Sequence, residues 1–238
     1  MTGSKTRQEG PPRHTALGIV ESISKGAFKD YEHTRDSLEC ETTHLSVYLK
    51  FGCVSNEKNA SLNTNYDKIP WAPHDTFFMA WCSGRTGFPI VDAGIRQLLT
   101  TGYMHNRVRM ISASFLIKVL RVDWRLGEKF FAQRLVDYHP SANSGGWQWA
   151  SGGGADSQQY NRVFSPWLQA KKHDPNCVYI KTFIPELNKV PNADILTWNT
   201  AFPSHEHATG YPRPIVADYH AEAKQSFAIY KKALYAKK

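Results

Sequence analysis

The strongest pattern of apolar and polar positions lies in residues 105–121. Its apolar residues recur at offsets of three, seven, eight and eleven positions, which places them on one face of an α-helix. A stripe of this width is typical of a helix that packs against a protein core, so we expect a central helix here. The stripe consists of Val108, Ile111, Phe115, Leu116 and Val119.

Other segments also show helical spacing, and few segments alternate as strands do. Residues 91–99 predict a helix that stops near Gly102, because glycine readily takes the left-handed conformation that ends helices. Residues 143–175 are rich in glycine, serine and proline and predict irregular loops with a short helix or two. The further predicted helices are 16–31, ending near Tyr31, 127–138 through Phe130, Phe131, Leu135 and Val136, and 218–236 with Phe227, Tyr230 and Leu234 on one side. The fold class predicted is all-α.

The length of 238 residues suits one large domain or two small ones. Residues 1–15 are polar and contain glycine and proline, so they predict a disordered tail. Residues 16–238 are expected to form one helical domain, in which the asparagine-rich residues 55–67 are a loop.

The formal net charge of +8 favours a polyanionic partner such as nucleic acid. The alternative is a basic protein whose positive charge serves only to prevent aggregation. The four cysteines lack metal-ligand spacing, which favours reduced thiols in a reducing compartment. No run of 18 apolar residues predicts a membrane span, and the polar start does not resemble a secretory signal.

Two further features are candidates for chemistry. The glycine-rich SGGGAD segment at 151–156 lacks the Lys-Ser/Thr of a nucleotide-binding loop, so we interpret it as a tight turn. Asn106 and Arg109 share a helix face and, if buried, need partners; Asp137 could pair with the arginine. The seven tryptophans could be core residues, stack on bases or relay electrons, and composition does not decide between these roles.

Long ordered stretches of the chain resemble the DNA photolyase and cryptochrome family. They are GRTGFPIVDAGIRQLLTTGYMHNRVRMISASFLIKVLRVDWRLGEKFF (84–131) and LVDYHPSANSGGWQWASGGGADSQQYNRVFSP (135–166), with TTHLSVYLKFGCVS (42–55) and YIKTFIPEL (179–187). The variant MHNR (104–107) looks like the class I branch that repairs cyclobutane pyrimidine dimers. The resemblance implies an all-α FAD-binding domain that holds the cofactor in a U shape.

By match of motif, the resemblance implies a cofactor site. Asn106 and Arg109 would lie along the flavin, Asp137 would pair with Arg109, and Asn143 would face the flavin N5. Hydroxyl and backbone N–H groups can donate to phosphate oxygens without a lysine. The residues expected at the FAD phosphates are Tyr31, Thr42, Thr43, Leu45 and Ser46.

The same resemblance implies an electron path and a DNA surface. Trp147, Trp124 and Trp71 match a three-tryptophan chain that carries electrons from the surface to the flavin, and Trp149 matches a ring that packs against the flipped pyrimidine dimer. Arg107 and Arg162 are candidates to hold DNA phosphates, so binding should weaken with salt.

The chain departs from the family pattern in three ways. It shows no N-terminal α/β antenna domain, so no antenna pigment is expected. A polar loop between Ser55 and Tyr66 replaces a helix that lines the lesion pocket in the family. His139 stands where an aspartate usually contacts the flavin, and a histidine would change the local charge. Smaller departures are His44, where arginine is common, and Tyr103, where tryptophan is common.

The leading hypothesis is a light-driven, FAD-dependent photolyase that acts as a lyase on pyrimidine dimers in damaged DNA. We expect a monomer in an intracellular, DNA-containing compartment, either a prokaryotic cytoplasm or a nucleus, without a membrane partner. Two alternatives remain: a cryptochrome-like flavin-binding photoreceptor module without repair, and a truncated remnant that binds DNA or FAD. The missing lesion-pocket helix favours these alternatives over full repair activity.

Overall fold

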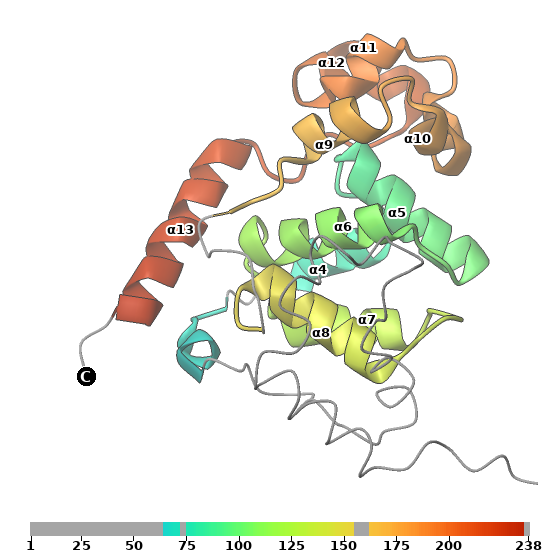
Figure 1. Ribbon diagram of the computed structural model, residues 1–238. Helices are drawn as coiled ribbons and strands as arrows, with labels where there is room; N and C mark the ends of the chain where they lie inside the picture. The colour runs from blue at the N-terminus through green and yellow to red at the C-terminus, as the bar shows by residue number, and fades with distance from the viewer. Residues whose placement is uncertain (1–63, 72–74, 155–161, 236–238) are drawn as a thin grey trace, which may run out of the picture. The chain divides into compact units, whose positions relative to one another are not determined.

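The computed structural model describes residues 64–71, 75–154 and 162–235, and within these ranges it contains helices and no strand (Figure 1). The predicted all-α class is therefore confirmed. The elements are η1 (Thr64–Lys68), α4 (Asp75–Cys82), α5 (Pro89–Thr101), α6 (Asn106–Lys118), α7 (Trp124–Ala132), α8 (Pro140–Ser151), α9 (Pro166–His173), α10 (Val178–Phe183), η2 (Pro185–Leu187), α11 (Asn192–Leu196), α12 (Trp198–Thr209) and α13 (Tyr219–Tyr235).

The chain divides into two compact units. One comprises Met1–Lys58 with His139–Ser141, and the other comprises Asn59–Tyr138 with Ala142–Lys238. The second unit contains nearly all of the described residues. The predicted tail at 1–15, the predicted helix at 16–31 and most of the loop at 55–67 lie outside the described residues.

Helices α5 and α6 form the centre of the second unit, where α5 packs against α4, α6, α9 and α10, and α6 packs against α7, α9 and α13 (Figure 1). All five residues of the predicted α6 stripe are buried, which confirms the pattern. His105 caps the start of α6, since its Nδ1 accepts the backbone N–H of Arg107. Gly102 ends α5 in the left-handed conformation (φ +70°), as predicted.

Asp92 ties the start of α5 to a distant part of the chain. Its fully buried carboxylate accepts the backbone N–H groups of Thr86 and Gly87, both at 2.9 Å, and the Thr86 hydroxyl at 2.6 Å. The Tyr211 hydroxyl donates to the same carboxylate, and Ile215 N–H donates to the Thr86 carbonyl at 2.9 Å. The carboxylate therefore replaces water for four donors in a place that water does not reach.

The prediction of a helix over 127–138 was wrong in its bounds. Helix α7 begins three residues earlier because the Asp123 carboxylate accepts the Arg125 N–H at 2.9 Å and so caps the first turn. It ends at Ala132, so Leu135 and Val136 follow the helix, and Val136 is 80% exposed. Leu135 and Val136 follow the helix at helical spacing, so the sequence pattern predicted a longer helix than the one that forms.

Residues 143–175, predicted as irregular loops with a short helix or two, contain two short helices, and the first of them, α8, begins before this region at Pro140. Its sequence PSANSGGWQWAS has two adjacent glycines, which disfavour a helix by roughly 1 kcal/mol each relative to alanine. The helix nevertheless buries Trp147, Gln148 and Ala150, and this packing outweighs the local preference. The SGGGAD segment does begin as a turn, since Gly152 (φ +94°) follows the last helical residue.

A tryptophan cluster fills the space between α4, α7 and α8. Trp81 is fully buried and lies with its ring centroid 6.1 Å from that of Trp147, and Phe131 lies 5.1 Å from Trp147. Gly127 of α7 permits this contact, because a Cβ at that position would lie 2.2 Å from the Trp147 ring. Trp81 carries no distinctive sequence signal, since its apolar spacing resembles that of any core residue.

We predict that Gly127→Ala destabilises the protein by about 1–3 kcal/mol, because overpacking of the Trp147 ring exceeds the helix-propensity gain of up to 1 kcal/mol. Chemical denaturation of the flavin-free protein measures this change in the free energy of unfolding. Gly145→Ala is the matched control: among the described residues nothing lies within 4 Å of a Cβ there, so the change should be neutral or stabilising. Equal effects of both substitutions would contradict the prediction.

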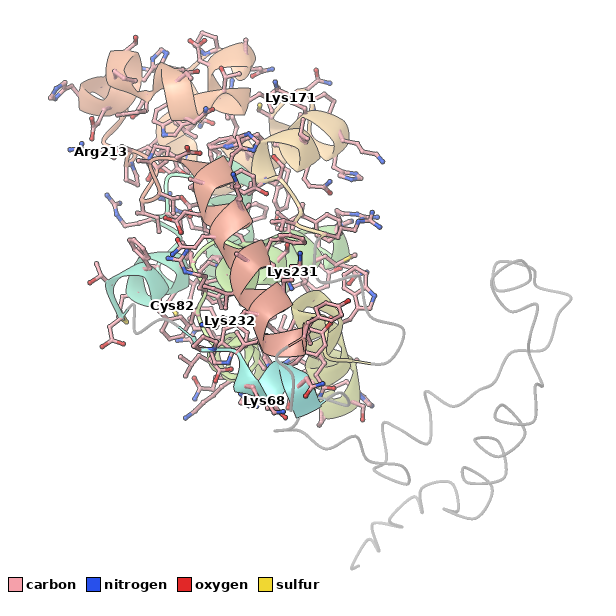
Figure 2. The ribbon with its side chains drawn as sticks, turned by 90° about the vertical axis from the view of Figure 1, so that its left-hand side faces the viewer. Lys68, Cys82, Lys171, Arg213, Lys231 and Lys232 are labelled. Atoms are coloured by element: carbon pink, nitrogen blue, oxygen red, sulfur yellow. The ribbon has the colours of Figure 1, made fainter. Side chains whose placement is uncertain are left out.

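Helix α13 is confirmed close to its predicted bounds and packs on η1 and α6. Figure 2 shows Lys231 and Lys232 on α13, with Lys68 on the adjoining η1. In the part of the chain that the structure describes, no helix is both long enough and apolar enough to cross a membrane.

Candidate functional site

The predicted ion pair between Arg109 and Asp137 is present. The Arg109 Nη2 donates to both carboxylate oxygens of Asp137 at 3.0 and 2.8 Å, and its Nε donates to the Met104 carbonyl at 2.7 Å. The guanidinium also lies over the Tyr103 ring, 5.4 Å from the centroid. These contacts hold α6 to the segment after α7, and Asp137 remains 45% exposed. An exposed pair of this kind adds little stability.

Asn106 differs from its expectation. It is the first residue of α6 and is exposed, so the argument that a buried asparagine needs a partner does not hold. Arg109 is half-buried on the same helix and meets its partner as predicted. The proposed contact of Asn106 with the flavin stays a prediction.

Asn143 is held by Glu128, a residue that no sequence motif pointed to. Its Nδ2 donates to the backbone carbonyl of Glu128 at 3.1 Å and to the Glu128 side chain at 3.0 Å, which orients the amide from α8 toward α7. The amide oxygen accepts no hydrogen bond from the described residues. Tyr138 reaches the same Glu128 carboxylate at 3.5 Å, and its pKa is raised by partial burial and by that negative charge.

Two glycines follow Asn143 closely in α8, and no side chain of the described residues covers the backbone there. Positions 145 and 146 are both glycine, and among the described residues nothing lies within 4 Å of a Cβ built on either. Glycine is costly inside a helix, so two of them with open space beside them fit a flat ligand that approaches the backbone closely.

Two of the three tryptophans of the expected electron path are buried, and the third is partly exposed. Trp147 and Trp124 are buried, with 2% and 1% of their surfaces exposed, and Trp71 is half-buried. Trp147 packs on Gly127, and Trp124 is one turn earlier on the same helix as that glycine. Contacts thus lead from α8 through α7 toward the surface.

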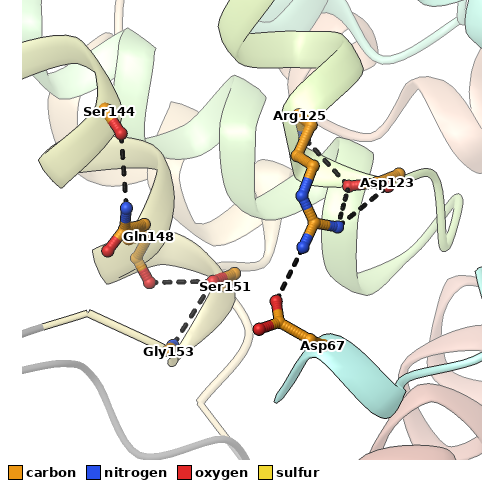
Figure 3. Close-up of polar contacts among 7 residues, drawn as sticks. All are labelled: Asp67, Asp123, Arg125, Ser144, Gln148, Ser151 and Gly153. Carbon is orange, nitrogen blue, oxygen red and sulfur yellow. Dashed lines mark hydrogen bonds and ion pairs between the residues drawn. The ribbon is translucent and has the colours of Figure 1, made fainter. Parts of the chain in front are cut away.

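Arg125 links the start of α7 to η1, the element just before Trp71. Its guanidinium donates to Asp123 at 3.1 Å and to Asp67 at 2.6 Å (Figure 3), and it lies over the Trp124 ring at 5.3 Å. The arrangement brings the segment of Trp71 to the helix end that carries Trp124. Figure 3 also shows Gln148 and Ser151 joined at the end of α8, where the Ser151 hydroxyl donates to the Gln148 carbonyl at 2.8 Å.

An aromatic and cationic cluster surrounds Trp71. Its ring lies 6.4 Å from that of Tyr230, and the Lys118 ammonium lies 3.4 Å from the Tyr230 centroid. Lys118 is buried and donates to the Ser151 carbonyl at 3.0 Å; burial lowers its pKa well below the ordinary value. Burial also disfavours the charged form of Tyr230 and so raises its pKa, and the Tyr230 hydroxyl has no hydrogen-bond partner among the described residues. The sequence placed Tyr230 on the apolar side of its helix but did not indicate Lys118, because a buried lysine has no sequence signal.

Trp149 and Arg162 meet at Phe164. The Trp149 ring is stacked on Phe164 with centroids 6.3 Å apart, and the Arg162 guanidinium lies 5.5 Å from the same ring. Trp149 is half-buried and Arg162 is exposed. The structure therefore brings these two expected DNA-binding residues to one aromatic platform.

Of the other predicted residues, Arg107 lies in the first turn of α6 and is half-buried, and the rest lie in the smaller unit or outside the described residues. His139 belongs to the smaller unit and directly precedes α8. Tyr31, Thr42, Thr43, Leu45 and Ser46 lie outside the described residues, as does His44. No group of histidine, cysteine, aspartate and glutamate in the described ranges could hold a metal ion.

The family model for the FAD-binding domain of DNA photolyase matches residues 42–232. The chain belongs to this family. Deoxyribodipyrimidine photo-lyase of Alkalihalophilus pseudofirmus is 45% identical over 183 residues, which are 73% of this chain and 37% of that protein. FAD is the cofactor that defines the family. The Asn143 amide and the two glycines after it in α8 are compatible with a flavin ring.

Solved structures agree with this assignment. A class III photolyase of Agrobacterium tumefaciens has a TM-score of 0.71 and 34% identity, covering 94% of this chain and 56% of that one. A cryptochrome of Synechocystis has a TM-score of 0.65 and 26% identity over the same shares. The chain thus spans about a third of the length of the curated photo-lyases and somewhat more than half of the solved ones.

Proposed function

We propose that the protein is a photolyase that binds FAD and uses light to repair cyclobutane pyrimidine dimers in DNA. The observation that carries the proposal is the sequence of groups along α8, where Asn143, two glycines that no described residue covers and buried Trp147 lie within five positions. One helix thus carries a polar amide, two residues without side chains and an oxidisable ring. A cofactor supplies the chemistry, and the protein positions and tunes it.

The residues of the chain have separate tasks in this proposal. FAD, when bound, absorbs blue light and exchanges an electron with the lesion. Asn143 presents an amide that can donate or accept as the redox state of its neighbour changes, and Glu128 orients that amide. Arg109 places a positive charge beside the ring, held in position by Asp137. Trp147, Trp124 and Trp71 supply electrons from the surface.

The platform of Trp149 and Phe164 supports the assignment of a DNA surface. An aromatic face can stack on an extruded base, which is how enzymes that act on bases hold their target outside the duplex. Arg162 lies at its edge, where a guanidinium can pair with a backbone phosphate. Arg107 and the net charge of +8 add to the attraction, so the protein would act in a DNA-containing compartment.

The similarity to a cryptochrome supports a second candidate, a flavin-binding photoreceptor module without repair. This candidate keeps the tryptophan path and needs no lesion pocket. A remnant that binds DNA through its charge, without stable FAD, is the third. The three differ in flavin content and repair, which are both measurable.

The deciding experiment measures flavin content first and repair second. Purified or FAD-reconstituted protein is expected to be yellow, to photoreduce its flavin, and to repair an oligonucleotide that carries a thymine dimer under blue light. Photoreduction without repair would replace the proposal with the photoreceptor candidate. Colourless protein after reconstitution would leave only the remnant.

A further inference from the structure

A small cavity lies at the start of α6, away from Asn143 and the tryptophan path. Its volume is about 190 Å³, below the roughly 300–1,000 Å³ of pockets for drug-sized ligands, so it suits a group of a few atoms. An apolar floor of Ile90, Val108 and Ile111 is covered by polar side chains from α6, α9 and α10. The polar residues that line it are His105, Arg107, His173, Asp174 and Tyr179.

Positive charge at this cavity is not neutralised by the described residues. The Arg107 guanidinium and the His173 imidazole make no hydrogen bond or ion pair with them, and Lys172 is next to His173 on the end of α9. By contrast, Arg96, Arg109, Arg121 and Arg125 each pair with a carboxylate. A cluster of such cations around a cavity attracts an anion from solution.

Asp174, the carboxylate that lines the cavity, already accepts hydrogen bonds from the backbone. Asp174 accepts the backbone N–H groups of Tyr179 at 3.1 Å and Ile180 at 2.9 Å, so it closes the first turn of α10. Its negative charge is directed to that helix end rather than to Arg107.

The wall formed by His105 is fixed in place. Its Nδ1 accepts the Arg107 N–H at 3.2 Å, which leaves Nε2 as the N–H donor of the neutral ring. Its backbone N–H donates to the Gln97 side-chain oxygen at 3.1 Å, and the Tyr179 hydroxyl donates to the same oxygen at 2.6 Å. One glutamine thus holds both walls, so the cavity is formed before any ligand arrives.

We propose that this cavity extends the DNA contact expected of Arg107 into a phosphate-binding subsite, in which His173 is the second charged contact and His105 an additional donor. Arginine matches phosphate with paired N–H groups, and the start of α6 adds the positive end of a helix dipole. The ligand assigned is a backbone phosphate of a DNA strand, and this assignment of the source rests on the proposed function. A free phosphate has the same chemistry, and the experiment separates the two.

Phosphate binding at this subsite is coupled to proton uptake. The pKa of His173 is lowered by desolvation, although the residue is exposed, and by the nearby Arg107, Lys172 and His105 side chains, so the neutral ring is favoured while the cavity holds no anion. An anion offsets those charges and favours the protonated ring, so binding strengthens as the pH falls. The other groups around the ring oppose this little: Asp174 is bound to α10, Tyr179 to Gln97, and Asp194 of the neighbouring α11 to His205.

The first measurement follows histidine imidazole resonances by NMR while inorganic phosphate is added to the flavin-free full chain. We expect His173 and His105 to shift and His207 on α12 to stay unchanged. His173→Phe and Arg107→Gln should each weaken phosphate binding about tenfold or more, the loss expected for one hydrogen bond to a charged group. Circular dichroism checks that the variants fold. Unchanged His173 resonances at saturating phosphate would overturn the subsite.

The second measurement titrates an undamaged oligothymidylate, whose phosphodiesters keep their charge between pH 6 and 8. His173→Phe should weaken binding at pH 6, flatten its pH dependence and reduce the salt slope by about 0.7, because one phosphate fewer is neutralised. Arg213→Gln is the control, since Arg213 is 72% exposed and lies outside the cavity (Figure 2). Weaker phosphate binding with unchanged DNA binding would overturn the DNA assignment. Neither measurement uses FAD or light, so failure of repair would leave both results standing.

Discussion

Trp147→Phe is expected to slow light-driven reduction of the bound flavin by at least about tenfold. An increase of about 1.4 kcal/mol in the activation free energy is enough for a change of this size. A phenyl ring gives up an electron far less readily than an indole, so a buried relay position would lose its function. The Trp147 ring contacts Gly127, Trp81 and Phe131, and a phenylalanine there keeps an apolar filling of most of that volume. FAD binding should therefore persist, and the absorbance of the flavin under blue light measures the rate.

Trp81→Phe is the matched control for this experiment. Trp81 is equally buried in the same cluster, 6.1 Å from Trp147, but it has no place in the expected path. Both variants should lose about 1–3 kcal/mol of stability through the smaller ring. If the two slow photoreduction alike, or if Trp147→Phe leaves it unchanged, the electron-transfer role of Trp147 is wrong.

Asp92→Ala is expected to lower the free energy of unfolding by about 3 kcal/mol or more, because it leaves buried donors without an acceptor. The two backbone N–H groups of Thr86 and Gly87 cannot turn elsewhere, and Tyr211 loses the acceptor of its hydroxyl. The contact between the start of α5 and the segment around Ile215 should loosen with it. Urea denaturation measures the change.

Asp137→Ala is the control, since it removes a carboxylate with two short contacts to Arg109 that is nevertheless 45% exposed. An exposed ion pair contributes about 0–1 kcal/mol, so this variant should be nearly as stable as the parent. It should instead weaken FAD binding if Arg109 is positioned for the cofactor. Similar losses of stability in both variants would contradict the argument from burial.

The pH dependence gives a separate check on Asp92. Burial raises the pKa of its carboxyl above the ordinary value, although the bonds from Thr86, Tyr211 and Gly87 act in the opposite direction. A raised folded-state pKa means that this contribution to stability is present below the unfolded-state pKa of about 4 and declines as the pH rises through the folded-state value. The decline should be absent in Asp92→Ala. If the stability of the parent protein and of Asp92→Ala changed by the same amount as the pH rises from about 4, the prediction would be contradicted.

Local sequence signals predicted those elements that leave a pattern within a short segment of the chain. The stripe in α6, the glycine end of α5 and the extent of α13 were all visible, because helical spacing and left-handed glycine are properties of a short segment. The same signals gave wrong bounds at α7, where a cap at Asp123 outweighed the apolar residues downstream, and they gave no bounds for α8, whose two glycines disfavour a helix.

The candidate site was predicted only where a motif carried it. The sequence by itself determined the all-α class, the central helices and the pairing of Arg109 with Asp137, because apolar period and opposite charge can be read from the order of residues. Only the tertiary structure decided that Glu128 orients Asn143, that Gly127 admits Trp147, and that His105, Arg107 and His173 surround one cavity. These contacts join helices far apart in the chain, and their geometry follows from how the helices pack rather than from any local preference.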